Sequence, residues 1–161
     1  MASLAKKITG YRICKSKYAK DFSGAGAEKY GGLWNSIGTP MLYTAESVSL
    51  AILETLVHVP RHLLPEDLSL VTLTIEILNE PIKLALKELP NHWNNLPFSS
   101  ESQKFGDKWI QSNNELALLE PSILVKQEFN MIINPRHKDF SKLSIQQIVP
   151  FAFDERLSSG I

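Results

Sequence analysis

Apolar and polar residues alternate in several short segments of the chain, which is the pattern of half-buried β-strands. Together with β-branched and aromatic residues, this pattern predicts strands over residues 8–14, 41–43, 68–78, 116–119, 122–127, 129–133 and 148–153. Residues 68–78 are the longest of these segments, and we expect them to form a central strand of the sheet.

Two further segments have the length and apolar spacing of helices. Residues 46–58 are apolar nearly all round, with Thr44 as the predicted N-cap and Pro60 as the stop, and residues 100–112 form a predicted surface helix anchored by Trp109. Residues 16–40 contain five glycines and no sustained apolar period, so we expect an ordered loop there. The mixed order of strands and helices predicts one compact α+β domain over residues 1–161.

The composition limits the classes of partner and the cellular compartment that we expect for the protein. Lysine plus arginine and aspartate plus glutamate number 17 each, so no net field attracts nucleic acid or an anionic membrane. Cys14 is the only cysteine, which excludes an internal disulfide and fits a reducing compartment. Residues 1–7 lack the apolar stretch of a signal peptide or a membrane span, so we expect a cytoplasmic protein without direct nucleic-acid or membrane contacts.

A narrow polar stripe interrupts the apolar helix predicted for residues 46–58. At about 100° per residue, Ser47, Glu54 and His58 fall within about 40° of arc. Two interpretations are open: the stripe faces water and Glu54 pairs with His58, or Glu54 lines a cleft. Tyr43, before the helix, also has two interpretations: a half-buried core residue, or a ring that stacks on a planar ligand.

Other candidate motifs exclude some classes of site. The glycines of residues 22–35 let the backbone approach a ligand, but their spacing fits neither the dinucleotide-binding GxGxxG motif nor a P-loop. Pro60 lies between His58 and His62 and no HExxH motif is present, so we predict no metal site. Ser122 lies outside any GxSxG elbow, which favours a ligand contact or a turn cap over a nucleophile.

A series of short motifs, taken together, resembles the RES domain family over nearly the whole chain. The motifs are Tyr11-Arg12, Phe22-Ser-Gly-x-Gly-Ala27, Gly31-Gly-x-Trp-Asn35, Gly38-x-Pro40, Leu42-Tyr-Thr-Ala-Glu-Ser47, Leu53-Glu54, Glu120-Pro-Ser122, Asn134-Pro-x-His137 with Asp139-Phe140, and Pro150-Phe-x-Phe-Asp154 with Arg156-Leu157. The resemblance implies a fold similar to that of ADP-ribosylating toxins. It also implies the toxin of a toxin–antitoxin pair, neutralised by an Xre-type helix-turn-helix antitoxin, and leaves a homodimer open.

The resemblance further implies an enzyme that needs no cofactor and takes NAD as its substrate. It implies three catalytic residues: Glu54 to stabilise the oxocarbenium-like transition state, Tyr43 to pack against the nicotinamide or its ribose, and Ser122 to position the nicotinamide end. The substrate-binding residues that it implies are Tyr11, Arg12 (for the diphosphate), Asn35, Ser47 and position 33. The acceptor is open among water, phosphate and a protein side chain, so that NAD breakdown and protein ADP-ribosylation share the first bond cleavage.

Leu33 departs from the family pattern. The family motif reads Gly-Gly-Arg-Trp-Asn, and here Leu33 replaces the arginine between Gly31-Gly32 and Trp34-Asn35. A guanidinium forms charge-assisted bonds to phosphate worth roughly 1.5 to 3 kcal/mol each, so we expect the loss of one to cost roughly tenfold to a few hundredfold. Leu33 is then either an attenuating substitution or the mark of an inactive paralogue, and the alternative function is a module that binds antitoxin and NAD without turnover.

Overall fold

The computed structural model describes residues 4–158, so the first three residues of the N-terminal segment considered above lie outside it. The strands are β1 Lys6–Lys15, β2 Leu42–Ala45, β3 Leu68–Ile77, β4 Ile82–Lys83, β5 Ala117–Pro121, β6 Phe129–Ile133 and β7 Leu143–Phe151. The helices are α1 Ala25–Tyr30, α2 Val48–Leu56, α3 Ser100–Ser112 and α4 Glu155–Ser158. Short 3-10 turns lie at Ser16–Tyr18 (η1), Arg61–Leu63 (η2), Leu86–Glu88 (η3) and Phe140–Lys142 (η4).

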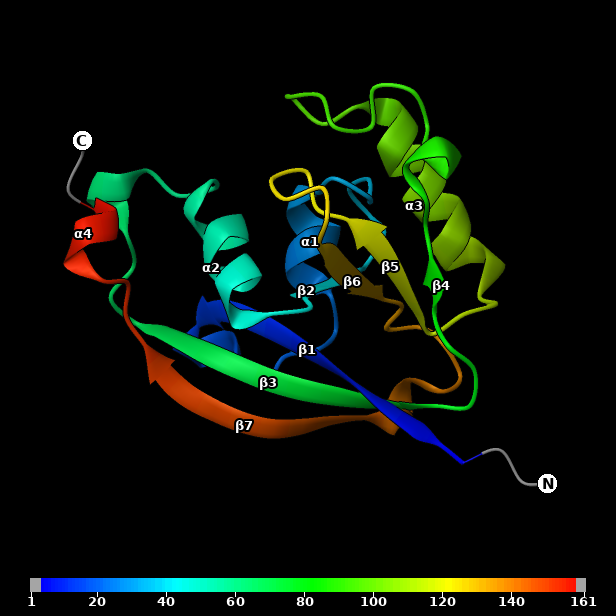
Figure 1. Cartoon of the computed structure of the whole chain (residues 1–161), viewed down its shortest axis with the longest axis horizontal. Coiled ribbons are helices and arrows are strands. Elements are labelled where there is room, and N and C mark those ends of the chain that lie inside the picture. The colour runs from blue at the N-terminus through cyan, green and yellow to red at the C-terminus, as the bar shows by residue number, and fades with distance from the viewer. Residues whose placement is uncertain (1–3, 159–161) are drawn as a thin grey trace.

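The strands form one sheet in the order β4-β5-β6-β2-β1-β3-β7. Neighbouring strands are antiparallel except β4 and β5, which are parallel. β1 and β3 pair over the full length of both strands, whereas β1 and β2 pair only at Tyr11 and Ala45. The sheet therefore has two parts, and Figure 1 shows β1, β3 and β7 running together while β2, β6, β5 and β4 rise beside them.

Alternation along the strands divides the apolar side chains between the two faces of the sheet. One face packs against α3 and the preceding loop through a cluster of Trp34, Met41, Leu84, Leu89, Trp93, Trp109, Ile110, Leu118 and Ile132. The cluster on the other face consists of Leu42, Leu73, Ile75, Leu116, Ala117, Met131 and Ile133. α2 has a small core of its own over β1 and β2, and Figure 1 shows it lying above these strands.

The helix α3 covers the predicted range 100–112, and capping groups set its ends. Ser99 accepts a hydrogen bond from the Ser102 backbone N at 3.1 Å, which satisfies one of the free N–H groups of the first turn. Asn113 ends the helix in the left-handed conformation with a φ of 52°. Trp109 is buried, as predicted for the residue that anchors this helix.

The helix α2 is shorter than residues 46–58, and the prediction of Thr44 as its N-cap is wrong. Thr44 continues β2 and donates its hydroxyl to the Met131 carbonyl at 2.9 Å. Ser47 caps the helix instead, because its Oγ accepts from the Leu50 backbone N at 3.1 Å. Ser47 thus has a structural use within α2.

Four further predictions of secondary structure differ from the fold. Residues 16–40 are not all loop, because they include η1 and the short helix α1, which follows Gly24 with its φ of 74°. Residues 122–127 form a turn rather than a strand, since Ser122 Oγ accepts the backbone N–H groups of Leu124 and Val125. β3 is next to the edge of the sheet rather than central, because β7 pairs along its outer side and begins at Leu143 rather than near 148.

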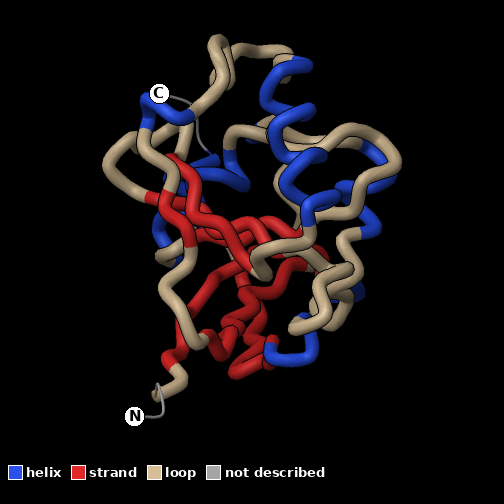
Figure 2. Tube along the Cα trace, turned by 90° about the vertical axis from the view of Figure 1, so that its right-hand side faces the viewer, coloured by secondary structure: helices blue, strands red, loops and turns tan. Residues whose placement is uncertain are grey.

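Figure 2 shows the strands as one continuous group, with most of the helices and long loops gathered towards one end of it. None of the helices formed by residues 4–158 has the length and apolar character that crossing a bilayer requires.

Candidate active site

A row of four residues crosses four neighbouring strands on one face of the sheet. Tyr11 of β1 pairs with Ala45 of β2, Ala45 pairs with Asn130 of β6, and Asn130 pairs with Glu120 of β5. Residues paired across adjacent strands point to the same face. The register therefore gathers their side chains on the face that α2 covers, where Tyr11 and Ala45 pack against the helix.

Glu54 of α2 meets this row from above. Its Oε1 accepts a hydrogen bond from Ser122 Oγ at 2.7 Å and a second from Asn130 Nδ2 at 2.7 Å. The side chain is half-buried, and its other oxygen, Oε2, accepts no hydrogen bond within residues 4–158. Two donors on one oxygen fix the direction of the carboxylate.

Ser122 is both a turn cap and a donor to Glu54. It is fully buried, and its Oγ accepts from the backbone N of Leu124 at 3.0 Å and of Val125 at 3.2 Å. A hydroxyl has one proton to donate. Since the turn uses the oxygen lone pairs, that proton is directed to Glu54, and Ser122 carries no arrangement that would activate it as a nucleophile.

Glu54 points into the fold and not towards His58. The ion pair between them, one of the two interpretations of the polar stripe, is not formed within residues 4–158, because Glu54 is bonded to Ser122 and Asn130. His58 is exposed, and its ring lies edge-on to Phe98 with 6.2 Å between the ring centroids. Of the polar stripe, only Glu54 belongs to the candidate site.

Tyr43 and Asn35 form a polar link at the edge of the apolar cluster beneath α3. The Tyr43 hydroxyl donates to Asn35 Oδ1 at 2.7 Å and accepts from the Trp34 backbone N at 3.0 Å. Burial raises the pKa of Tyr43 well above its ordinary value, so the phenol is neutral at every physiological pH. A Cβ at Gly32 would lie 2.8 Å from both the Tyr43 hydroxyl and Asn35 Oδ1, so only glycine fits this close approach.

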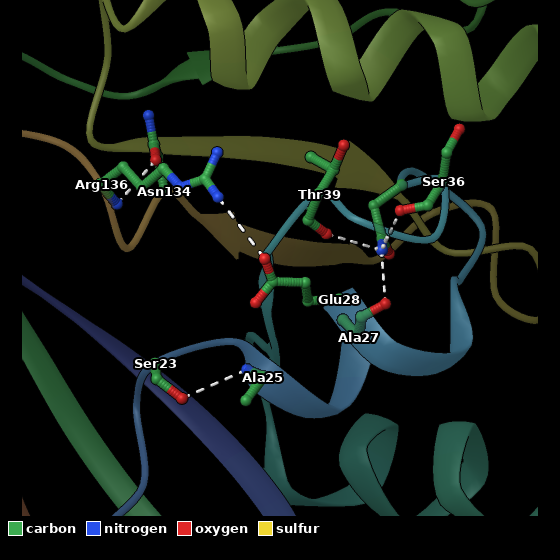
Figure 3. Close-up of polar contacts among 9 residues, drawn as sticks. Ser23, Ala25, Ala27, Glu28, Ser36, Thr39, Asn134 and Arg136 are labelled. Atoms are coloured by element: carbon green, nitrogen blue, oxygen red, sulfur yellow. Dashed lines mark hydrogen bonds and ion pairs between the residues drawn. The ribbon is translucent and has the colours of Figure 1, made fainter.

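The amide of Asn35 holds the loop around it. Its Nδ2 donates to the carbonyls of Ala27 at 2.7 Å, Ser36 at 3.2 Å and Thr39 at 3.0 Å. Figure 3 shows these three residues grouped at α1, with the Glu28 carboxylate joined to Arg136 nearby. All polar atoms of the Asn35 side chain are used inside the protein, so its contribution to a substrate site is to shape the loop.

Leu33 lies in the same loop, which α3 holds at close range. Gln103 Nε2 donates to the Gly32 carbonyl at 3.0 Å. A Cβ at Gly106 would lie 1.7 Å from the Trp34 carbonyl oxygen, so α3 can approach this closely only with glycine there. Leu33 is partly buried and packs against the apolar cluster of Trp34, so a fixed backbone presents position 33.

Arg12 lies on the opposite face of β1 from Tyr11, and its contact with the diphosphate stays a prediction. It follows Tyr11 in the strand, and successive strand residues point to opposite faces. Its guanidinium donates to the carbonyls of Asp21 and Tyr18, both at 2.8 Å, and lies 5.5 Å from the centroid of the Phe22 ring. Arg12 therefore fixes the loop that follows β1.

Asn130 and Glu120 are the residues that sequence reasoning missed. Glu120 is 1% exposed, and its Oε2 has no hydrogen-bond partner within residues 4–158. Burial raises the pKa of Glu120 to about 8, and the charge of Glu54 acts in the same direction, while the side-chain N–H groups of Asn130 and Trp34 act against it. The only sequence signal was that Glu120 precedes Pro121-Ser122 in one of the motifs.

Comparison with known proteins gives consistent relatives. A family model described as RES domain matches residues 9–154. Toxin Res of Yersinia enterocolitica is 42% identical over 91% of this chain and 97% of its own length, and Toxin Res of Photorhabdus laumondii is 40% identical over 91% and 95%. The Prs ADP-ribosylating toxin of Sphingobium sp. is 37% identical over 86% of this chain and 88% of its own.

A solved structure gives the same fold. A chain of the crystal structure of the M. tuberculosis MbcT–MbcA toxin–antitoxin complex superposes with a TM-score of 0.68 over 91% of this chain and 85% of that one, at 19% identity. The predicted α+β fold class and the resemblance to the RES family are thereby confirmed.

Proposed function

Because this chain belongs to the RES domain family, we propose that it is the toxin of a toxin–antitoxin pair and that it cleaves the bond between nicotinamide and ribose in NAD. The observation that carries the proposal is the geometry of the Glu54 carboxylate. The Ser122 hydroxyl and the Asn130 amide both donate to its Oε1, which leaves Oε2 for a ligand. A fixed carboxylate of this kind suits a reaction in which positive charge develops.

In the proposed reaction the bond between C1′ of the ribose and N1 of the pyridinium breaks heterolytically. The electron pair goes to N1, which leaves as neutral nicotinamide, and the ribose becomes oxocarbenium-like. Glu54 Oε2 stabilises that cation and orients the ribose hydroxyls. Water then adds at C1′ and loses a proton, or phosphate or a protein side chain takes its place.

Ser122 and Asn130 contribute by holding Glu54 in place, and Tyr43 contributes an aromatic wall. Both bonds to Glu54 are short, at 2.7 Å, so the carboxylate does not need to reorganise when charge develops. Tyr43 uses its hydroxyl for Asn35, so its ring is the part that is available to pack against nicotinamide or ribose. Tyr11 and Ser47 also help to position Glu54, because Tyr11 packs against α2 and Ser47 caps it.

The proposed site has few groups that would bind the diphosphate of NAD. Arg12 lies on the other face of β1, and Leu33 stands where the resemblance implies an arginine. On the Glu54 face, the described residues therefore supply neither of the two cations that the resemblance implied for the phosphates. This specific observation favours a second candidate function, a module that occupies the antitoxin without turning over NAD.

The proposed partner is an Xre-type helix-turn-helix antitoxin that neutralises the chain by binding it. The support is the family and the structural relative, which is itself a toxin–antitoxin complex. A homodimer stays a prediction that the molar mass in solution tests. NAD is the proposed substrate, and no cofactor is proposed.

The test of this function measures free nicotinamide from NAD, with and without inorganic phosphate, for the purified chain and for Leu33→Arg. The arginine variant is expected to release nicotinamide roughly tenfold to a few hundredfold faster, because it regains a charge-assisted phosphate contact. Leu33→Lys is the matched control, since it restores charge without the bidentate geometry and is expected to recover less. If neither Leu33→Arg nor the parent chain releases nicotinamide, the proposal of NAD cleavage is wrong and the binding module takes its place.

A further inference from the structure

A second carboxylate lies directly behind the proposed catalytic one. Glu120 is the second-last residue of β5, two residues before Ser122, and is 1% exposed. Its register partner on β6 is Asn130, the residue whose Nδ2 donates to Glu54 at 2.7 Å. Glu120, Asn130 and Glu54 therefore follow one another from the sheet to the helix.

Among the described residues, the surroundings of Glu120 offer hydrogen-bond donors but no cation. The indole Nε1 of Trp34 is buried without a hydrogen-bond partner in residues 4–158, as is Glu120 Oε2, and this N–H group acts on the carboxyl. The charged or titratable groups that face it are Glu54 from α2 and Tyr43 from β2. On the neighbouring β4, Lys83 directs its Nζ over the Phe129 ring at 4.0 Å instead.

Two adjacent carboxylates without a cation between them do not both ionise at low cost. Glu54 has two hydrogen bonds to its Oε1 and is half-buried, so it is the better anion of the two. Glu120 is fully buried with an unpartnered oxygen, so it is the better carrier of the proton. In its neutral form the carboxyl has an O–H to donate.

We propose that Glu120 is a positioning residue of the NAD site, and that its neutral carboxyl supports Asn130 from behind and leaves Glu54 as the only charged carboxylate. The inference rests on the proposed function for its consequence in catalysis, but not for the protonation itself. When Glu120 ionises, its charge repels that of Glu54, so the Glu54 carboxylate loses its fixed position. Activity should therefore fall with the fraction of neutral Glu120, which gives the pH profile an alkaline limit near 8.

The first test observes the proton without any substrate. Infrared difference spectra of the unmodified chain between pH 6 and pH 10 are expected to contain the carbonyl band of a protonated carboxylic acid that disappears with a midpoint near 8. Glu120→Gln should lack that band, and Glu54→Gln, the matched control, should keep it. A chain without the band at pH 6, or a band lost in Glu54→Gln and kept in Glu120→Gln, overturns the inference.

The second test uses nicotinamide release in the Leu33→Arg background. With Glu120 present, the rate is expected to fall about tenfold from its plateau by pH 9, as one ionisation near 8 requires. With Glu120→Gln added, the ratio of the rates at pH 9 and pH 7 should stay near one, because glutamine mimics the neutral acid. Identical profiles overturn the positioning role. If Leu33→Arg releases no nicotinamide at all, the proposed function fails, while the infrared band still decides the state of Glu120.

Discussion

Replacement of Glu120 by glutamine should change how the stability of the protein depends on pH. Burial raises the pKa of Glu120 to about 8 in the folded state, from about 4.5 when it is exposed to solvent. Between these two values the folded protein binds one proton more than the unfolded chain. The contribution of Glu120 to the free energy of unfolding is therefore intact below about pH 4.5, is lost as the pH rises, and is fully lost above about pH 8.

The magnitude follows from the difference between the two pKa values. Each pKa unit corresponds to about 1.4 kcal/mol. As the pH rises from the unfolded pKa to the folded pKa, the free energy of unfolding therefore falls by roughly 5 kcal/mol. Glutamine has the shape of the neutral acid and does not ionise, so Glu120→Gln lacks this slope. A difference of this size is a large share of the total stability of a small domain.

Urea denaturation at pH 5, 6, 7, 8 and 9 measures the effect for the unmodified chain and for Glu120→Gln. The stability of Glu120→Gln relative to the parent is expected to rise with pH up to about 8 and to level off above it. Glu101→Gln on the exposed face of α3 is the control, because its carboxylate is 59% exposed and its removal should leave a constant difference. Parallel curves for parent and Glu120→Gln would refute the reasoning, since Glu120 would then ionise equally in both states.

Three other substitutions test separate parts of the structure. Ser122→Ala removes the cap of the 122–128 turn and a donor to Glu54, and thermal denaturation should show a loss of about 1 to 3 kcal/mol. Gly106→Ala should lower the melting temperature strongly, because its Cβ would lie 1.7 Å from the Trp34 carbonyl oxygen; an unchanged value would contradict the close approach. Arg12→Ala should destabilise the loop after β1 but leave the Kd for NAD unchanged in calorimetry, whereas a weakened Kd would return Arg12 to the site.

The sequence predicts α3 well, because this helix has a strong local signal at each end. Residues 100–112 begin after a serine that caps and end before an asparagine that adopts positive φ. The prediction of a strand over 122–127 is wrong for a reason that is also local. Ile123, Leu124 and Val125 are β-compatible side chains, but the Ser122 hydroxyl takes their backbone N–H groups for a turn.

The site is harder to predict from the sequence, because it depends on pairing between strands that are distant along the chain. Glu54 and Ser122 were expected from the family motifs, and the fold places their oxygens 2.7 Å apart. Asn130 joins them only through its register with Ala45 and Glu120. Arg12 was assigned to the site by the family resemblance, and strand parity alone does not say which face of β1 α2 covers.

The central claim is that Glu54 performs the cleavage of NAD, and nicotinamide release by Leu33→Arg with and without Glu54→Gln tests it most directly. The account predicts that glutamine lowers kcat by at least about a hundredfold and changes KM little, because the carboxylate acts on the transition state and not on the bound diphosphate. Thermal denaturation of both variants checks that the fold is kept. A double variant that releases nicotinamide as fast as Leu33→Arg alone would contradict the account.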